Sequence, residues 1–259
     1  MNVRGARIVV TGASRGIGAA LATELAARGA RVVLVARSAE PLEKLAAELD
    51  GEVFPADLTD AATIEPLVRS IEADGPIDAL VNNAGVDLTG DLVDLPADAI
   101  TALIALNLTA PMLLCRAVIP GMLQRRRGHL VNVSSLAATN ALPGVTPYSA
   151  SKAGLSHFTA GLRAELKGTS IGTTLAQIGP VESTMIESLR THEPTRRALA
   201  RLERMRLAFD LDPAVVVAAI ADAIEHDTRH VRLPKRAALF PIIVEVPRRL
   251  TELILAGVR

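Results

Sequence analysis

Residues 6–18 read ARIVVTGASRGIG, and this stretch decides the fold. A short β-branched run, 6–10, predicts a buried strand, and the Ala- and Leu-rich residues after Gly18 favour a helix. Between them lie three glycines, at positions 12, 16 and 18. A glycine-rich turn that leads from a strand into a helix presents free backbone N–H groups to an anion. The stretch therefore predicts a strand–loop–helix unit that binds a phosphate group.

Each glycine of this loop has a separate physical task. Gly12 allows a sharp turn, Gly16 allows the backbone to approach a phosphate, and Gly18 allows the helix to pack closely on the strand. The spacing G-x-x-x-G-x-G differs from the G-x-G-x-x-G dinucleotide fingerprint. An ordinary tight turn is the alternative. The candidate cofactor-binding residues of the loop are Gly12, Ser14, Arg15, Gly16, Ile17 and Gly18.

The rest of the chain repeats the alternation of strand and helix. Strands are predicted at 6–10, 31–35, 52–54, 77–81, 128–133, 171–178 and 229–233. Helices are predicted near 16–28, 39–49, 60–73, 96–124, 148–167 and 212–226. The first three strands are continuous apolar runs, as expected of buried parallel strands. The fold class is therefore α/β, a Rossmann-type doubly wound parallel sheet of about seven strands with helices on both faces.

Length and composition narrow the possible functions. The 259 residues show no repeat or linker and fit a single domain, 1–259. The formal net charge is zero and aromatic residues make up 2%, which argues against a nucleic-acid-binding protein. The single cysteine, Cys115, lies in an apolar stretch and is expected to be a buried hydrophobic residue. With no recognisable secretory signal, a cytoplasmic location is expected.

The only tyrosine and one of four lysines form a second candidate site. Tyr148 and Lys152 are four residues apart at the start of a predicted helix, so their side chains share one face. An ammonium beside a phenol lowers the pKa of the phenol, which makes it usable in proton transfer near neutral pH. A half-buried tyrosine beside a surface lysine is the equally simple alternative.

The sequence resembles the short-chain dehydrogenase/reductase family over roughly residues 5–233. The motifs follow one another along the chain in the same order as in that family. The cofactor loop at 11–18 is similar to that of the family, and so are Asp57-Leu58 and Asn82-Asn83-Ala84-Gly85, which follow the third and fourth strands. Asn107 matches the helix asparagine of the family, and Ser135 precedes Tyr148 by 13 residues, the usual spacing. Ser134 is adjacent, and the spacing favours Ser135.

The resemblance implies a role for each of these residues. Tyr148 is the general acid or base, Lys152 lowers its pKa and holds the nicotinamide ribose, and Ser135 binds the substrate oxygen. Asn107 holds a water in a proton relay that ends at Lys152. Asp57, Leu58, Asn83, Ala84 and Gly85 line the cofactor, together with Tyr148, Lys152 and Val181. The chain departs from the family at Ile178-Gly179-Pro180, where Ile178 replaces the first proline, and the sequence leaves open which of Ser183 and Thr184, if either, anchors the carboxamide.

The cofactor expected from the sequence is NADP, with NAD the less favoured alternative. NAD enzymes of the family carry an acidic residue after the second strand, but this chain has Ala36 followed by Arg37. With Arg15 in the loop, two guanidinium groups are available for a 2′-phosphate. Two unrelated surface arginines are the alternative.

Two segments fall outside the regular pattern. In this family the segment 182–211 covers the active site as a substrate lid. Here it carries arginines at 190, 196, 197, 201, 204 and 206, and Leu199, Leu202, Met205 and Phe209 recur at helical spacing. A solvated basic face is favoured over recognition of an acidic substrate or carrier. The apolar segment 237–259 packs on a subunit, covers the substrate pocket (which implies apolar substrates) or makes peripheral membrane contact.

These features together predict an NADP(H)-dependent oxidoreductase that interconverts a carbonyl and a secondary alcohol. A catalytically silent dinucleotide-binding sensor or scaffold is the alternative. No metal site is expected, because only His226 and His230 have ligand spacing and no third ligand is evident. The resemblance implies a homodimer or homotetramer through the helices near 96–124 and 148–167. Leu155, Phe158, Leu162 and Leu166 are expected to form an outer apolar face of the second helix.

Overall fold

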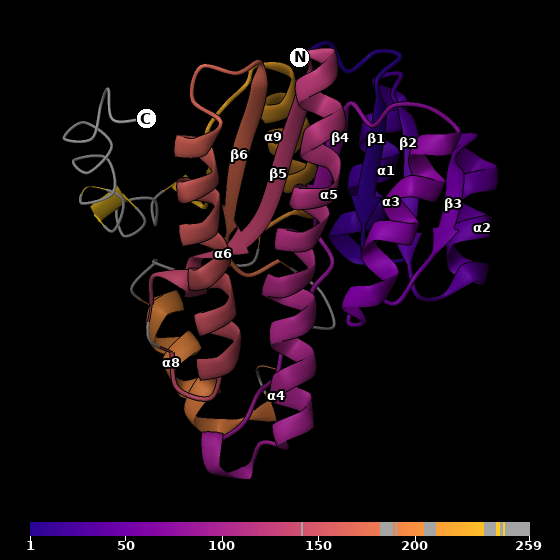
Figure 1. Ribbon diagram of the computed structural model, residues 1–259. Helices are drawn as coiled ribbons and strands as arrows, with labels where there is room; N and C mark the ends of the chain where they lie inside the picture. Colours follow the sequence, from indigo (N-terminus) through magenta and orange to yellow (C-terminus); the bar gives the residue numbers. More distant parts are fainter. Residues whose placement is uncertain are drawn as a thin grey trace.

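The computed structural model describes residues 1–140, 142–181, 189, 191–204, 211–235, 242–243 and 246, apart from the side chain of Leu202. Its centre is one sheet of seven parallel strands in the order β3-β2-β1-β4-β5-β6-β7 (Figure 1). The strands are β1 (Arg7–Thr11), β2 (Arg31–Ala36), β3 (Glu52–Pro55), β4 (Ala79–Asn82), β5 (Gly128–Ser135), β6 (Ile171–Ile178) and β7 (His230–Leu233). The predicted fold class is confirmed.

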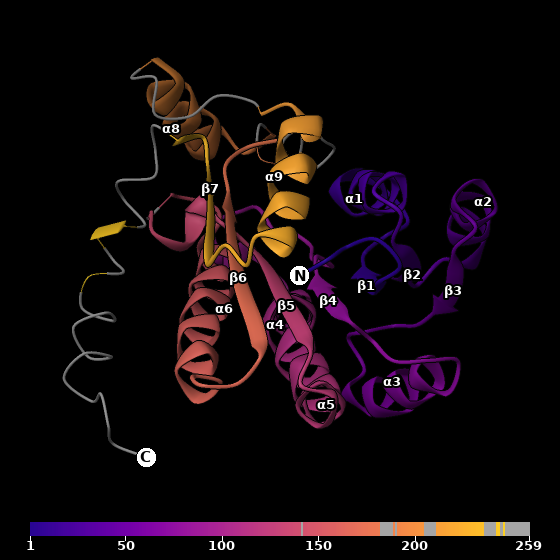
Figure 2. The ribbon, with the colours of Figure 1, turned by 90° about the horizontal axis from the view of Figure 1, so that it is seen from above.

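Helices cover both faces of the sheet (Figure 2). On one face lie α1 (Gly16–Ala27), α2 (Ala39–Leu49) and α9 (Pro213–Glu225), and on the other α3 (Ile64–Ala73), α5 (Ala110–Arg125) and α6 (Thr146–Glu165). Two further helices in the described part of the chain are α4 (Ala97–Ile104) and α8 (Glu193–Arg204), and its short turns are η1 (Ala61–Thr63), η2 (Leu92–Asp94), η3 (Ala105–Thr109) and η4 (Leu136–Ala138). Asp212 caps the N-terminus of α9, since its Oδ1 accepts from the Ala214 N–H at 2.8 Å.

The strand order reverses direction between β1 and β4. From β1 the chain moves outward to β2 and β3, and then returns to place β4 on the other side of β1. In a doubly wound sheet the loops after these two strands diverge to opposite faces and leave a crevice at their carboxyl ends. This crevice is where the fold predicts a ligand.

The predicted helix near 96–124 is interrupted at its centre. The continuous helical segment Ala97–Arg125 contains a π-helical turn, η3, between α4 and α5. By length and hydropathy this segment is apolar enough to cross a membrane. However, Leu114, Cys115 and Val118 of α5 are fully or almost fully buried in the core against the sheet, as expected of a core helix.

Two packing expectations are wrong. β3 is an edge strand whose residues are half-buried or exposed, so its apolar run does not mark a strand covered on both faces. Leu155, Leu162 and Leu166 do not form an outer face of α6, because each is at most 8% exposed within the single chain. The exposed residues of α6 are instead small or polar: Thr146, Ala150, His157, Gly161, Ala164 and Glu165. The expected burial of Cys115 is confirmed, and burial raises the pKa of its thiol to about 12.

Candidate active site

The glycine loop and the loop after β4 are joined at the crevice. Thr11 Oγ1 accepts from the backbone N–H groups of Asn83 and Ala84, both at 3.0 Å. The Asn83 side-chain amide donates to the Thr11 carbonyl oxygen, also at 3.0 Å. A Cβ added to Gly12 would lie 2.8 Å from the Ala84 Cα. The two loops therefore meet so closely that position 12 has no room for a side chain.

The other two glycines of the loop have different surroundings. A Cβ on Gly18 would lie 2.2 Å from the Gly12 carbonyl oxygen, so Gly18 permits close packing of helix and loop. Gly16 has a left-handed φ of +57°, and a Cβ there would meet no described atom within 4 Å. No side chain of the described residues caps the first turn of α1. The uncapped helix start and the open side of Gly16 fit an approaching phosphate.

Asn107 lies in the π-helical turn and is completely buried. Its Oδ1 accepts from the Val86 N–H at 2.9 Å, and its Nδ2 donates to the Val86 carbonyl at 2.8 Å and to Ser151 Oγ at 3.2 Å. Ser151 Oγ donates in turn to the Tyr148 carbonyl at 2.7 Å. Asn107 therefore ties the loop after β4 to the helix that carries Tyr148.

The two serines at the end of β5 differ in their surroundings. Ser134 is buried, and its Oγ donates to the Lys152 carbonyl at 3.0 Å and lies 2.8 Å from Ser156 Oγ. Ser135 is half-buried, and its Oγ accepts from the Ala137 N–H at 3.1 Å. Ser134 is occupied inside the fold, whereas Ser135 lies beside Tyr148 and forms a side-chain hydrogen bond with it.

Tyr148 and Lys152 lie together in the first turns of α6. The Lys152 Nζ is 6.0 Å from the centre of the Tyr148 ring and donates to the Val133 carbonyl at 2.9 Å. Burial lowers the pKa of Lys152 to about 8. The pKa of Tyr148 is raised, mainly by burial and also by the charge of Asp87, while the hydrogen bond with Ser135 opposes the rise. The pKa of Tyr148 therefore shifts in the opposite direction to the sequence expectation, because burial is its largest cause.

A matching family model describes short chain dehydrogenases and covers residues 6–194. A 3-oxoacyl-[acyl-carrier-protein] reductase of Vibrio cholerae is 33% identical over 224 residues, which cover 85% of this chain and 90% of the relative. A crystal structure of a short-chain dehydrogenase from Streptomyces avermitilis has a TM-score of 0.81 at 28% identity, covering 99% of this chain and 98% of that one. A single-residue variant of actinorhodin polyketide ketoreductase with NADPH has a TM-score of 0.80 at 30% identity, covering 88% and 95%.

The chain belongs to the short-chain dehydrogenase family. Membership makes it an oxidoreductase of the class that acts on CH–OH and C=O groups. Four residues match the catalytic positions of the family: Asn107, Ser135, Tyr148 and Lys152. The structure places them around the carboxyl ends of β4 and β5.

The residues expected at the adenosine end of this dehydrogenase lie after β2 and β3. Ala36 ends β2 and Arg37 follows it, while Arg15 lies in the glycine loop; both arginines are exposed, and neither guanidinium forms a hydrogen bond or ion pair with a residue that the structure describes. Leu58 is 3% exposed. The Asp57 carboxylate accepts from Thr59, which lowers its pKa, and the charge of Arg37 lowers it further.

The remaining predicted residues are only partly described. Val181 is buried and forms a parallel bridge with Leu211 on the far side of the lid segment. Ser183, Thr184, Met205 and Phe209, the arginines at 190 and 206, and most of 237–259 lie outside the described residues. Within α8, Thr195 and Leu199 are buried and the arginines at 196, 197, 201 and 204 are exposed, which is the predicted amphipathic pattern.

Sequence reasoning missed three features of the site. It gave no sign of the π-helical turn that presents Asn107, of Ser151 as the link to Tyr148, or of Asp87 as a charge near Tyr148. A π-turn inside a long helix is common at functional sites, but it has no reliable sequence signature. Asp87 directly follows Asn83–Val86, and its position two residues after the NNAG element was the available signal.

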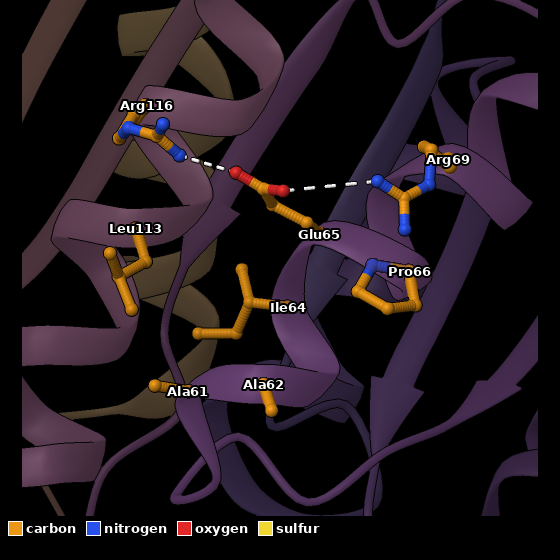
Figure 3. A pocket seen from close by; sticks show the side chains of 8 residues that line it. All are labelled: Ala61, Ala62, Ile64, Glu65, Pro66, Arg69, Leu113 and Arg116. Atoms are coloured by element: carbon orange, nitrogen blue, oxygen red, sulfur yellow. Dashed lines mark hydrogen bonds and ion pairs between the residues drawn. The ribbon is translucent and has the colours of Figure 1, made fainter.

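A shallow hollow on the outer surface lies apart from these residues (Figure 3). It is lined by residues of η1, α3 and α5, among them Ile64 and Leu113. Glu65 forms ion pairs with Arg116 at 2.5 Å and with Arg69 at 3.8 Å across its rim. None of the predicted catalytic or cofactor-binding residues lines this hollow.

Proposed function

We propose that this protein is an NADP(H)-dependent oxidoreductase that interconverts a carbonyl compound and a secondary alcohol, with Tyr148 as the general acid or base. The observation that carries the proposal is the convergence of Tyr148, Ser135 and Lys152 at the carboxyl edge of the sheet. The same edge holds the glycine loop, joined to the loop after β4. A proton-transfer group and a phosphate-binding loop thus lie in one crevice.

The raised pKa of Tyr148 defines its protonation state. At neutral pH the phenol keeps its proton, so it can donate that proton to a substrate oxygen as negative charge develops there. Ser135, which forms a hydrogen bond with Tyr148, is placed to bind the same oxygen. In the reverse direction Tyr148 must accept the proton, and the cationic form of Lys152, favoured below about pH 8, assists by stabilising the phenolate.

Asn107 acts on this geometry as a positioning residue. Its side chain uses both amide hydrogens and accepts one hydrogen bond, so it holds Val86 and Ser151 in fixed positions. A Cβ on Gly85 would lie 3.1 Å from Asn107 Oδ1 and 3.4 Å from Lys152 Nζ, so both polar groups face the same glycine. The water relay from Asn107 to Lys152 stays a prediction.

The residues of the crevice fit a phosphorylated dinucleotide. NADP(H), when bound, supplies or accepts the hydride. Gly16 offers an open backbone, and the uncapped start of α1 offers N–H donors for the pyrophosphate. Arg37 directly follows β2, whose last residue is Ala36 and not an acid, and exposed Arg15 lies in the glycine loop; these two arginines would hold a 2′-phosphate. The actinorhodin ketoreductase, a similar fold described with NADPH, supports this choice.

The test is to follow nicotinamide absorbance with NADPH and NADP⁺ over a panel of ketones, 3-oxoacyl thioesters and secondary alcohols. Turnover of at least one pair in both directions, with NADPH preferred to NADH, is the expected result. Tight NADPH binding without turnover of any pair would instead favour the silent sensor or scaffold. The intact Asn107, Ser135, Tyr148 and Lys152 set supports the enzyme.

A further inference from the structure

The first turn of the lid helix α8 is attached to two loops at the site edge of the sheet (Figure 1). Thr195 is fully buried, and its Oγ1 donates to the Pro143 carbonyl at 2.8 Å. The same Oγ1 lies 2.8 Å from His192 Nδ1, and His192 Nε2 lies 3.5 Å from the Asp91 carboxylate. A Cβ on Gly144 would lie within 2.4 Å of both His192 and Thr195, so the approach requires a glycine there.

Each of the two loops is close in sequence to residues of the candidate site. Gly144 is four residues before Tyr148, and the loop of Asp91 continues from Asn83 and Gly85. The Gly90 N–H donates to the Gly144 carbonyl at 2.9 Å, which joins the two loops directly. The first turn of α8 is therefore attached both to the loop that precedes Tyr148 and to the loop that follows β4.

The hydrogen-bond geometry specifies where the protons are. Thr195 has one hydroxyl hydrogen, and the Pro143 carbonyl cannot donate, so that hydrogen belongs to the bond with Pro143. His192 Nδ1 must then donate to Thr195 Oγ1. In a neutral imidazole this leaves a lone pair on Nε2, which faces the negative charge of Asp91. An imidazolium, with hydrogens on both nitrogens, can donate to Thr195 Oγ1 and also attract the Asp91 carboxylate.

Few other charges bear on this ring in the described part of the chain. Glu193, the next residue, faces away to pair with Arg196 and Arg197. The loop 143–145 contributes no ionisable side chain. His192 is 17% exposed at its side chain and Asp91 is 65% exposed, so Asp91 remains within reach of solvent while the ring is largely covered.

We propose that Asp91, His192 and Thr195 form a proton-dependent latch that holds the first turn of α8 against the loops of Asp91 and Gly144 when His192 carries both ring protons. In neutral His192 the contact with Asp91 becomes repulsive, and α8 opens more often. The latch thereby positions the lid for substrate binding without taking part in proton transfer to the substrate. Its effect on substrate binding rests on the proposed function, but its effect on α8 does not.

Hydrogen exchange of residues 191–204 in the full-length protein without cofactor tests the latch directly. Protection factors, corrected for intrinsic exchange, are compared at about pH 5.5 and about pH 8, because histidine side chains in general change their charge between about pH 5 and pH 8. We expect about two- to tenfold greater protection at the lower pH, the factor equivalent to one net hydrogen bond. Equal protection at the two pH values would overturn the proposal.

Asp91→Asn separates a proton-dependent latch from a merely structural contact. The Asn amide can donate to the lone pair of a neutral His192, so this variant is expected to keep α8 equally protected at both pH values, at or above the wild-type level at about pH 8. His192→Ala is expected to show low protection at both. Low protection of Asp91→Asn throughout would contradict the latch. His226→Gln, at the end of α9, is the matched control and should retain the wild-type pH dependence.

A kinetic experiment then tests the link to the proposed function. With a turned-over substrate, KM should rise about two- to tenfold from about pH 5.5 to about pH 8 in the wild type, relative to Asp91→Asn, while kcat stays similar in the two proteins. A pH-dependent latch in hydrogen exchange with no difference in KM would refute the role in substrate binding. Failure of the proposed function alone would leave the hydrogen-exchange result unchanged.

Discussion

Replacing Lys152 with methionine removes a charge that folding takes out of water. Lys152 is 5% exposed, and burial lowers its pKa from the usual 10.5 to about 8. A difference of about 2.5 pH units corresponds to about 3 kcal/mol at 1.36 kcal/mol per unit. The folded protein therefore carries this cost at neutral pH, where Lys152 is protonated in both the folded and the unfolded chain.

The pH dependence of this cost has a definite sign. Between about pH 8 and about pH 10.5 the unfolded chain keeps the Lys152 proton and the folded chain has lost it, so the unfolded state binds more protons. The free energy of unfolding of the wild type, taken relative to Lys152→Met, should therefore rise by about 3 kcal/mol across this window. Below about pH 8 the difference should be constant.

At neutral pH the variant should be more stable than the wild type by about 1–2 kcal/mol. The removed charge contributes about 3 kcal/mol, and losing the hydrogen bond to the Val133 carbonyl takes back about 1–2 kcal/mol. Nicotinamide-dependent turnover should fall sharply in the same variant, because the amine beside Tyr148 is gone. The wild-type protein would then be less stable than Lys152→Met by about 1–2 kcal/mol because it keeps a buried lysine that the reaction needs.

The assay is urea unfolding of both proteins at equal concentration between about pH 7 and about pH 10. The free energy of unfolding is plotted against pH for each protein, and one plot is subtracted from the other. The contributions of ionisable groups that both proteins share then cancel. Lys44→Met, on the exposed side of α2, is the control and should leave the wild-type profile unchanged. A flat difference between wild type and Lys152→Met over the alkaline window would refute the reasoning.

Three further predictions follow from the described structure. Arg37→Asp should move kcat/KM toward NADH, because it places a carboxylate after β2; equal or better use of NADH by the wild type would contradict the cofactor assignment. Gly18→Ala should lower the free energy of unfolding by about 1–3 kcal/mol and weaken NADPH binding, because the added Cβ would lie 2.2 Å from the Gly12 carbonyl oxygen. If urea unfolding and the dissociation constant of NADPH were both unchanged, the close packing at Gly18 would not matter for stability or binding. Light scattering at micromolar concentration should show a homodimer or homotetramer, and exposed Met112 and Leu123 on α5 now carry this expectation in place of the buried leucines of α6; a monomer would refute it.

The fold could be predicted from local patterns because those patterns are strong. The β-branched runs, the glycine loop after β1 and the Asp212-Pro213 start of α9 each specify an element through backbone sterics or capping. Long-range packing was harder to predict. A leucine at helical spacing can face the sheet or a second subunit, and sequence does not distinguish these, so Leu155 and Leu162 were misplaced.

In the candidate site, too, local features could be predicted from the sequence and long-range ones could not. The spacing of Tyr148 and Lys152 on one helix and the adjacency of Asn83 and Gly85 could be predicted from sequence, and so could the preference for Ser135. The electrostatics could not, because the pKa of Tyr148 depends mainly on how much water the fold excludes from the phenol. The contact of His192 with Asp91 joins segments about a hundred residues apart and also required the structure.

The measurement that tests the central claim most directly is the turnover of Tyr148→Phe, together with its affinity for NADPH. The substitution keeps the ring and removes the hydroxyl that forms the hydrogen bond with Ser135. We predict that kcat falls by about 10²–10⁴-fold, the usual worth of general acid–base catalysis, while the dissociation constant of NADPH stays within about threefold of the wild type. Retention of more than about a tenth of the wild-type kcat would contradict the assignment of Tyr148.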